Sequence, residues 1–310
     1  MHKQVTSQLL MVRPANFSSN TETLETNKFQ SGLNINDSQE SIQSLAIEEF
    51  DNMVNLLRDH QITIFDLDDI KELNNTDALF PNNWVTFHQD NTAVIYPMMA
   101  KSRRKEKRND ILKYLEEFES FRIEKVVDLS YLEKDGCFLE GTGSMVLDRI
   151  NKIVFACESS RTSINALEVF CKKLNYSSVV FEAVNDDLPI YHTNVMMSLG
   201  QETAFICSES IKDQKDIKHI HKLFGISKRK IIELSIAQMI QFAGNVLEVE
   251  NTKGQSHLIM SEKAYQSLEA PQIQSISKSS KIISIPLDTI EKYGGGSARC
   301  MIAEIFLQKS

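Results

Sequence analysis

The stretch NWVTFHQDNTAVIYP, residues 83–97, is the clearest sign of the fold. A polar head residue is followed by a short apolar run, a polar turn and a second apolar run, which is the pattern of a β-hairpin. The same pattern returns three times further along the chain. The later stretches are SMVLDRINKIVFA (144–156), NVMMSLGQETAFIC (194–207) and NVLEVENTKGQSHLIM (245–260). The chain therefore repeats one supersecondary unit, which indicates a repeat architecture.

The two ends of the chain complete the series. CMIAEIF, residues 300–306, resembles the first strand of a fifth hairpin that lacks a second strand. We expect QLLMVRP, residues 8–14, to pair with it and to close the units into a ring. A helical stretch and a third strand follow each of the first four hairpins. The sequence thus predicts an α/β fold of five ββαβ units, each about 50 to 60 residues long. A plain α/β protein with many hairpins is the alternative.

We expect residues 1–310 to form a single domain, because the ring uses both ends of the chain. Residues 15–42 are polar, rich in Asn, Ser and Thr, and without a clear period. They predict a loop that is free to move, and a disordered linker is the plainer interpretation.

Composition excludes several classes of protein. The net charge of −8 argues against a general nucleic-acid binder. The five cysteines are widely spaced and form no CxxC pair, so we expect neither a disulfide framework nor a structural zinc site. The first residues lack the apolar core of a signal peptide, and no apolar run is long enough for a membrane span. We therefore expect a cytoplasmic protein without nucleic-acid or membrane partners.

Residues that could take part in catalysis lie at or beside the heads of the repeats, the polar residues that precede each first strand. They are Asn83, Glu140, His192, Asn194 and Cys300. If the units form a ring, the starts of their first strands point toward its axis, and these side chains converge on one pocket. Cysteine with histidine and an orienting polar group is an arrangement typical of a thiol nucleophile. The glycines of GGGSARC, residues 294–300, would give a substrate a flexible, side-chain-free approach to that thiol.

In these motifs the chain resembles the guanidine-modifying enzymes of the pentein fold, which include arginine deiminases, dimethylargininases and amidinotransferases. LEGTG resembles the family motif LEGGD, YHTN resembles His-x-Asp, and GGGSARCM resembles the glycine-rich stretch before the nucleophile. The resemblance implies a five-bladed α/β propeller with its site at the hub. It also implies Cys300 as nucleophile, His192 as acid and base, and Glu140 as the catalytic carboxylate, with no metal and no cofactor.

Two further segments resemble the family. PMMAKSRRKE and ESSRTS are similar to segments whose arginines can hold a substrate carboxylate, and they place Arg103 and Arg161 in that role. A guanidinium group suits this role because it can bind a carboxylate through two parallel hydrogen bonds.

Departures from the family pattern bear on the substrate. Asn83 and Asn194 stand where the family usually has aspartates that bind a guanidinium group, and Gly143 stands in place of the aspartate of LEGGD. An amide both donates and accepts, so it suits a neutral ureido group with its own C=O and NH₂. The resemblance is nearest to a branch implicated in citrulline use.

We therefore predict a cysteine-dependent hydrolase that converts citrulline to ornithine, ammonia and carbon dioxide. The alternatives are a deiminase of arginine or methylarginine, and a binding protein on the same fold. The implied partner is a small amino-acid substrate. The sequence does not decide between a monomer and a homodimer.

Overall fold

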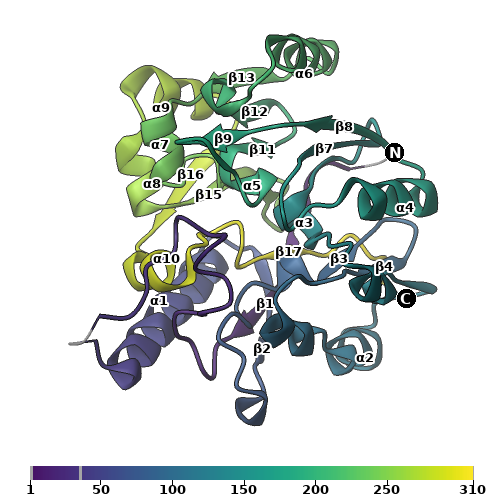
Figure 1. Cartoon of the computed structure of the whole chain (residues 1–310), viewed down its shortest axis with the longest axis vertical. Helices are drawn as coiled ribbons and strands as arrows, with labels where there is room; N and C mark the ends of the chain where they lie inside the picture. Colours follow the sequence, from purple (N-terminus) through teal and green to yellow (C-terminus); the bar gives the residue numbers. More distant parts are fainter. Residues whose placement is uncertain (1–2, 35–36, 310) are drawn as a thin grey trace.

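Five three-stranded sheets surround the centre of the molecule in the computed structural model, which describes residues 3–34 and 37–309 (Figure 1). The sheets consist of β3 (Val85–Phe87), β4 (Thr92–Ile95) and β5 (Lys125–Asp128); β6 (Val146–Asp148), β7 (Ile153–Cys157) and β8 (Ser177–Phe181); β11 (Met197–Leu199), β12 (Thr203–Ile206) and β13 (Lys230–Glu233); β14 (Leu247–Glu250), β15 (Ser256–Ser261) and β16 (Lys281–Ile285); and β17 (Ala303–Glu304), β1 (Gln8–Arg13) and β2 (Thr63–Asp68). A short ribbon of β9 (Val184–Asn185) and β10 (Leu188–Pro189) lies outside them.

Helices connect the strands. The α-helices are α1 (Gln39–Asp59), α2 (Asn109–Glu117), α3 (Gly141–Ser144), α4 (Ile164–Leu174), α5 (Thr193–Met196), α6 (Gln214–Ile226), α7 (Ile236–Ile240), α8 (Glu262–Ser267), α9 (Ala270–Ile276) and α10 (Asp288–Gly294). The 3₁₀ turns are η1 (Lys71–Leu73), η2 (Pro81–Asn83), η3 (Lys101–Glu106), η4 (Ser130–Asp135) and η5 (Ser208–Ser210). None of the helices in the described part of the chain has the length and hydropathy that a membrane span requires.

Every three-stranded sheet repeats one pairing scheme. In the first, β3 runs antiparallel to β4, and β4 runs parallel to β5, so that Val85 pairs with Ile95 and Ile95 with Asp128. A parallel pair needs a crossover connection, which α2 supplies here. In the sheet that joins the chain ends, β17 is antiparallel to β1 and β1 is parallel to β2, with α1 as the crossover. The predicted pairing of residues 8–14 with the C-terminal strand is therefore confirmed.

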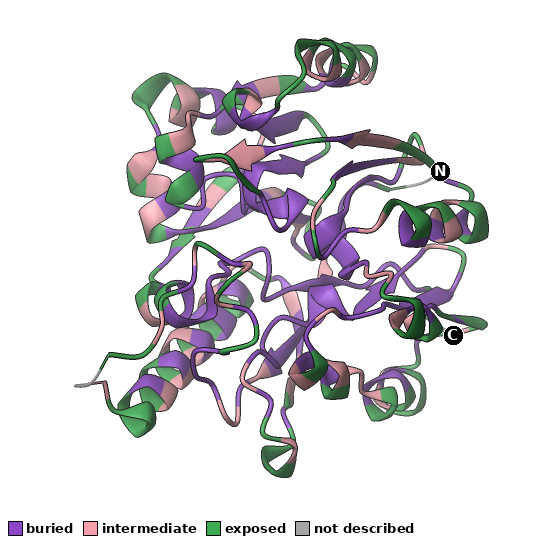
Figure 2. Ribbon diagram, viewed as in Figure 1, coloured by how far each residue is buried: buried purple, intermediate pink, exposed green. Residues whose placement is uncertain are grey.

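The first strand of each hairpin lies toward the centre. Contacts join β17 to β3, β6 to β11, and β11 to β14. The middle strands β4 and β12 are buried along their whole length, whereas β5 and β13 each have only one buried residue. Figure 2 shows the same gradient from a buried interior to exposed outer helices. This arrangement places the end of each first strand near the middle of the ring.

The heads of three repeats differ from the prediction in their local structure. Asn83, Ser144 and Asn194 were expected at strand starts, but they lie in the short helical turns η2, α3 and α5. The strands begin two or more residues later. These turns contact one another, since α3 packs against both η2 and α5.

The described residues of the β1–α1 segment, 14–34 and 37–38, pack against the rest of the protein. Its side chains reach distant elements, because Asn20 Nδ2 donates to Asp77 Oδ2 at 2.7 Å and Asn27 Nδ2 donates to the Gly295 carbonyl at 3.0 Å. Phe17 is fully buried. The predicted loop thus ends earlier than residue 42, since α1 begins at Gln39, and its described part is a packed cover rather than a linker.

Candidate active site

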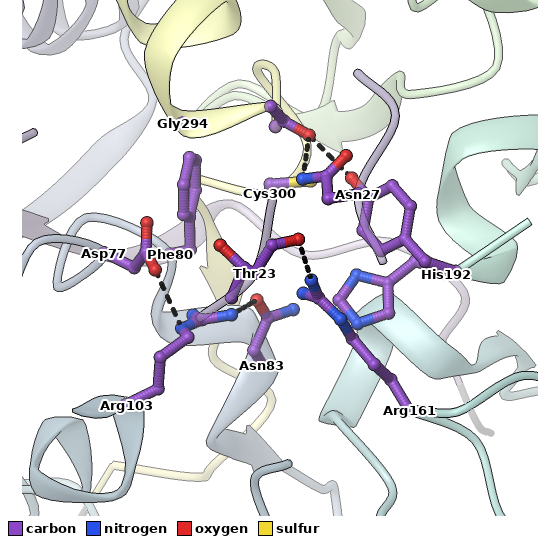
Figure 3. A pocket seen from close by; sticks show the side chains of 13 residues that line it. Thr23, Asn27, Asp77, Phe80, Asn83, Arg103, Arg161, His192, Gly294 and Cys300 are labelled. Carbon is purple, nitrogen blue, oxygen red and sulfur yellow. Dashed lines mark hydrogen bonds and ion pairs between the residues drawn. The ribbon is translucent and has the colours of Figure 1, made fainter. Parts of the chain in front are cut away.

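A narrow cavity of about 20 Å³ lies under the β1–α1 segment, near the centre of the ring (Figure 3). Its walls come from six separate parts of the chain. They include Thr23, Asn27, Asp77, Phe80, Asn83, Arg103, Arg161, Tyr191, His192, Gly294, Gly295, Gly296 and Cys300. Five of the seven predicted site residues line this cavity directly, and Glu140 and Asn194 lie just behind it in contact with His192 and Cys300. The structure therefore brings all seven together.

The three glycines before Cys300 allow close packing. A side-chain carbon on Gly294 or Gly296 would lie 2.9 or 3.0 Å from the ring of Phe80, which is too close. Gly295 has φ +61, a left-handed conformation that favours glycine. A side chain at Gly296 would also crowd the Cβ of Cys300 at 3.2 Å. The glycines thus keep the approach to the thiol free of side chains, as predicted, but through tight packing instead of flexibility.

The Cys300 thiol is buried between two amides. Asn245 Nδ2 lies 3.2 Å from Sγ, and Asn194 Nδ2 lies 3.6 Å from it. Burial raises the pKa of the Cys300 thiol, and the backbone at Ser297 and the Asn245 amide act in the opposite direction. In the absence of substrate the thiol is thus protonated at neutral pH. The two amide N–H groups are placed to stabilise the sulfur when it becomes negative.

His192 and Glu140 form a buried pair. His192 Nε2 lies 2.8 Å from Glu140 Oε2, and Glu140 Oε1 accepts from the Met99 backbone N–H at 3.1 Å. Burial acts to raise the pKa of Glu140, but Arg161, His192 and Arg103 outweigh it and hold that pKa well below its usual range. Burial lowers the pKa of His192 to about 4, although Glu140 opposes the shift. The imidazole is therefore neutral at pH 7, with its proton on Nε2 and a free lone pair on Nδ1.

Two glycines of LEGTG let the neighbouring turns approach this pair. A side chain on Gly141 would collide with the Asn82 carbonyl at 2.1 Å. A side chain on Gly143 would lie 2.5 Å from Asn83 Nδ2 and 2.7 Å from His192 Nδ1. The space that an aspartate would occupy at position 143 is thus taken by the Asn83 amide and the imidazole edge.

Arg103 is held mainly by protein carboxylates. It makes two parallel hydrogen bonds to Glu106, at 2.8 and 2.9 Å, and lies 3.5 Å from Asp77. Its Nη1 donates to Asn83 Oδ1 at 3.1 Å. Asn83 Nδ2 is buried and has no hydrogen-bond partner. The Asn83 amide therefore directs a free donor toward the space near His192.

Arg161 has more capacity for a further partner. Its Nη2 donates to Thr26 Oγ1 at 2.8 Å, Nη1 lies 3.6 Å from Glu140 Oε2, and the guanidinium carbon lies 4.9 Å from the centre of the Tyr191 ring. Its Nε is buried without a hydrogen-bond partner.

Some residues of the site lay outside the sequence prediction. Asp77 and the cover residues Thr23 and Asn27 come from polar stretches without a period, so no local signal marks them. Asn245 carried a signal, because it heads the fourth repeat. Within residues 3–34 and 37–309, no group of three or more His, Cys, Asp or Glu side chains is arranged to hold a metal ion.

A family model for N,N-dimethylarginine dimethylhydrolase of the eukaryotic type matches residues 13–307. The chain belongs to this family. Membership confirms the predicted pentein superfamily and the predicted class of enzyme, a hydrolase of non-peptide C–N bonds. A comparison with curated protein sequences gave no match.

Solved structures confirm the fold of this dimethylhydrolase family member. The apo structure of ArgZ, an arginine dihydrolase from the ornithine–ammonia cycle in cyanobacteria, superposes with a TM-score of 0.74 at 18% identity. The match covers 96% of this chain, which spans only 40% of ArgZ. The N-terminal domain of ArgZ, as a cysteine-to-serine mutant bound to substrate, gives a TM-score of 0.74 at 18% identity and covers 96% of this chain and 97% of the domain.

A dimethylarginine dimethylaminohydrolase has the same fold. Its histidine-to-glycine mutant, as an adduct with S-methyl-L-thiocitrulline, gives a TM-score of 0.66 at 16% identity. The match covers 98% of this chain and 100% of that structure. The predicted propeller fold is thus shared by relatives whose structures hold small amino-acid ligands.

Proposed function

We propose that this protein hydrolyses the terminal C–N bond of an arginine-like amino acid, and that it accepts the ureido group of citrulline best. The products are then ornithine, ammonia and carbon dioxide. The observation that carries this proposal is the free Nδ2 donor of Asn83, which is buried beside His192 where a carboxylate would repel a ureido oxygen. A C=O group can accept from this amide, whereas an aspartate could only accept.

The first chemical step forms a bond between Cys300 and the substrate. The sulfur attacks the ureido carbon, and the thiol proton passes to His192 Nδ1. The bond to the terminal nitrogen breaks, that nitrogen takes the proton from His192, and ammonia leaves. A thiocarbamate ester remains on Cys300. The amides of Asn194 and Asn245 stabilise the developing charge on sulfur, and Glu140 stabilises the imidazolium that forms for a moment.

The second step uses water. His192 takes a proton from the water, the water oxygen bonds to the carbon, and the C–S bond breaks. The electron pair returns to sulfur, which recovers its proton from His192. The released carbamate loses carbon dioxide and becomes the amine. Neutral His192 is suited to this role as a base because its pKa lies below 7.

Arginine is a second candidate as the first substrate. Asp77 lines the cavity and is almost fully buried, so it can accept hydrogen bonds from a cationic group. ArgZ, which has the same fold, is an arginine dihydrolase, and this supports arginine as a substrate. In this case hydrolysis of arginine to citrulline precedes the ureido step at the same cysteine.

The change Asn83→Asp tests the ureido preference. A carboxylate at this place binds a guanidinium through charge-assisted hydrogen bonds and repels a ureido oxygen. The ratio of kcat/KM for citrulline over that for arginine should therefore fall by roughly tenfold or more. Asn175→Asp adds the same charge at the exposed end of α4 and serves as the control, since it should leave the ratio unchanged. An unchanged or higher ratio in Asn83→Asp would remove the basis of the proposal.

The change Arg161→Lys tests which arginine holds the substrate carboxylate. We propose Arg161 for this role because its Nε is free, and we assign Arg103 mainly to ordering Glu106 and Asp77. Loss of the guanidinium fork should raise KM by roughly tenfold to a hundredfold with a smaller effect on kcat.

Two comparisons control the Arg161 result. Arg103→Lys should mainly lower the melting temperature, because it disturbs the paired contact with Glu106. A decarboxylated analogue of the substrate should be poor for the wild type and insensitive to Arg161→Lys. Equal kcat/KM for the amino acid and the decarboxylated analogue in the wild type would exclude both arginines from carboxylate binding.

A further inference from the structure

A second cavity lies close to the catalytic one, since Asn194 of its wall contacts Cys300 of the catalytic cavity. It has a volume of about 30 Å³, which is room for one small ion, and its walls include Asn194, Ser198, Arg149, Arg299 and Glu304. We name it the axial chamber, because the inner strands β6, β11, β14 and β17 contribute to it. The Asn194 side chain lines the chamber and contacts Cys300 Sγ at 3.6 Å. Nothing in the mechanism above uses this space.

The chamber carries one positive charge in excess. Arg149, Arg299 and Glu304 are 5%, 7% and 9% exposed. Both arginines reach the same atom, Glu304 Oε2, at 3.5 Å from Arg149 and 2.8 Å from Arg299. The neighbouring Asp148 does not correct the balance, because it is paired with Arg229. A buried charge without a full counter-charge is costly, so two guanidinium groups on one carboxylate favour the binding of an anion.

The arginines keep donors for such an anion. Arg299 Nη1 donates to the Ile302 carbonyl at 2.9 Å, and Arg299 Nη2 donates to Glu304 Oε2 at 2.8 Å. Arg149 lies over the Phe306 ring, with its guanidinium carbon 4.1 Å from the ring centre. Its contact with Glu304 is at the limit of hydrogen-bond length, so its planar group has donors left for an oxyanion.

A hydroxyl group in the same wall supplies an independent observation. Ser198 is only 8% exposed, and its Oγ has no hydrogen-bond partner. A buried hydroxyl without a partner is unfavourable, and it is rare in folded proteins. Because Ser198 lines the chamber, a bound group there would satisfy it.

From these observations we infer that the axial chamber binds a small monovalent inorganic anion, held by Arg149, Arg299 and the Ser198 hydroxyl. The matching chemistry is that of nitrate, bicarbonate or chloride. The site is separate from the substrate pocket, and the inference does not depend on which amino acid the enzyme hydrolyses.

Thermal unfolding in nitrate tests the inference. Sodium nitrate replaces sodium gluconate at constant ionic strength, and the melting temperature is followed as nitrate rises. An anion that binds only the folded protein raises stability in a saturable manner, and we expect a rise of about 2–4 °C in the wild type. Ser198→Ala should show a smaller rise, and Arg149→Gln should show none. A parallel series with bicarbonate and chloride ranks the anions.

The control variant is Ser275→Ala. Ser275 also has a buried hydroxyl without a hydrogen-bond partner, but it lies in α9 and does not line the chamber. It should respond to nitrate as the wild type does. If Arg149→Gln does not fold, the comparison of Ser198→Ala with Ser275→Ala still decides the question. The same rise in Ser198→Ala and Ser275→Ala, or no rise in the wild type, would overturn the inference.

Discussion

Replacing Cys300 with alanine is expected to lower kcat by roughly 10⁴-fold or more, since no other group can form the covalent intermediate. The thiol lies in the same cavity as His192 and accepts contacts from the amides of Asn194 and Asn245. Alanine removes one sulfur atom from a residue that is 3% exposed, so the fold should persist with a modest loss of stability. The measurement is kcat for the preferred substrate, with circular dichroism and thermal unfolding as the check on folding.

A matched change elsewhere controls for the loss of a thiol. Cys171 is half-buried on α4 and does not line the cavity, so Cys171→Ser should retain wild-type kcat. If Cys300→Ala kept its activity within tenfold of the wild type while remaining folded, the covalent mechanism would be wrong.

Replacing Glu140 with glutamine should lower kcat by roughly 10²- to 10⁴-fold. The carboxylate fixes the Nε2 proton of His192 at 2.8 Å and stabilises the imidazolium during proton transfer. A glutamine side chain is neutral and can present its NH₂ group to the imidazole instead. It also leaves Arg161 and Arg103 without the carboxylate that lies 3.6 and 3.8 Å from them.

The pH profile separates this role from a purely structural one. Glu140 raises the pKa of His192, while burial lowers it to about 4. Without the carboxylate the pKa of His192 falls further, so the acid limb of the kcat profile should move to lower pH as its maximum falls. A profile that keeps its shape and position while only the amount of folded protein drops would assign Glu140 to stability alone.

The sequence was sufficient to predict the overall architecture because the fold depends on a repeated local pattern. Each hairpin alternates apolar runs with a polar turn, and middle strands such as β4 and β12 are mainly apolar because both of their faces are covered. The pairing of β1 with β17 followed from the one unit that lacked a strand. Because the first residues of the repeats occupy equivalent positions around the ring, Asn83, Asn194 and Cys300 lie close together.

Local structure at the heads could not be predicted in the same way. The turns η2, α3 and α5 have three or four residues, which is too short for a periodic signal. They are fixed by contacts between distant segments, such as Gly141 against the Asn82 carbonyl. The packing of the β1–α1 cover also depends on contacts between distant segments. Polar side chains such as Asn20 and Asn27 can be buried there because they donate hydrogen bonds to Asp77 and to the Gly295 carbonyl. Tertiary hydrogen bonds of this kind leave no mark in the local sequence.

Product analysis with the purified protein tests the central claim most directly. Citrulline and arginine are each incubated with the wild type, and ammonia, citrulline and ornithine are measured over time, with Cys300→Ala as the blank. The account predicts one ammonia per ornithine from citrulline, and no product with Cys300→Ala. Release of neither ammonia nor ornithine from either amino acid by the folded wild type would contradict it.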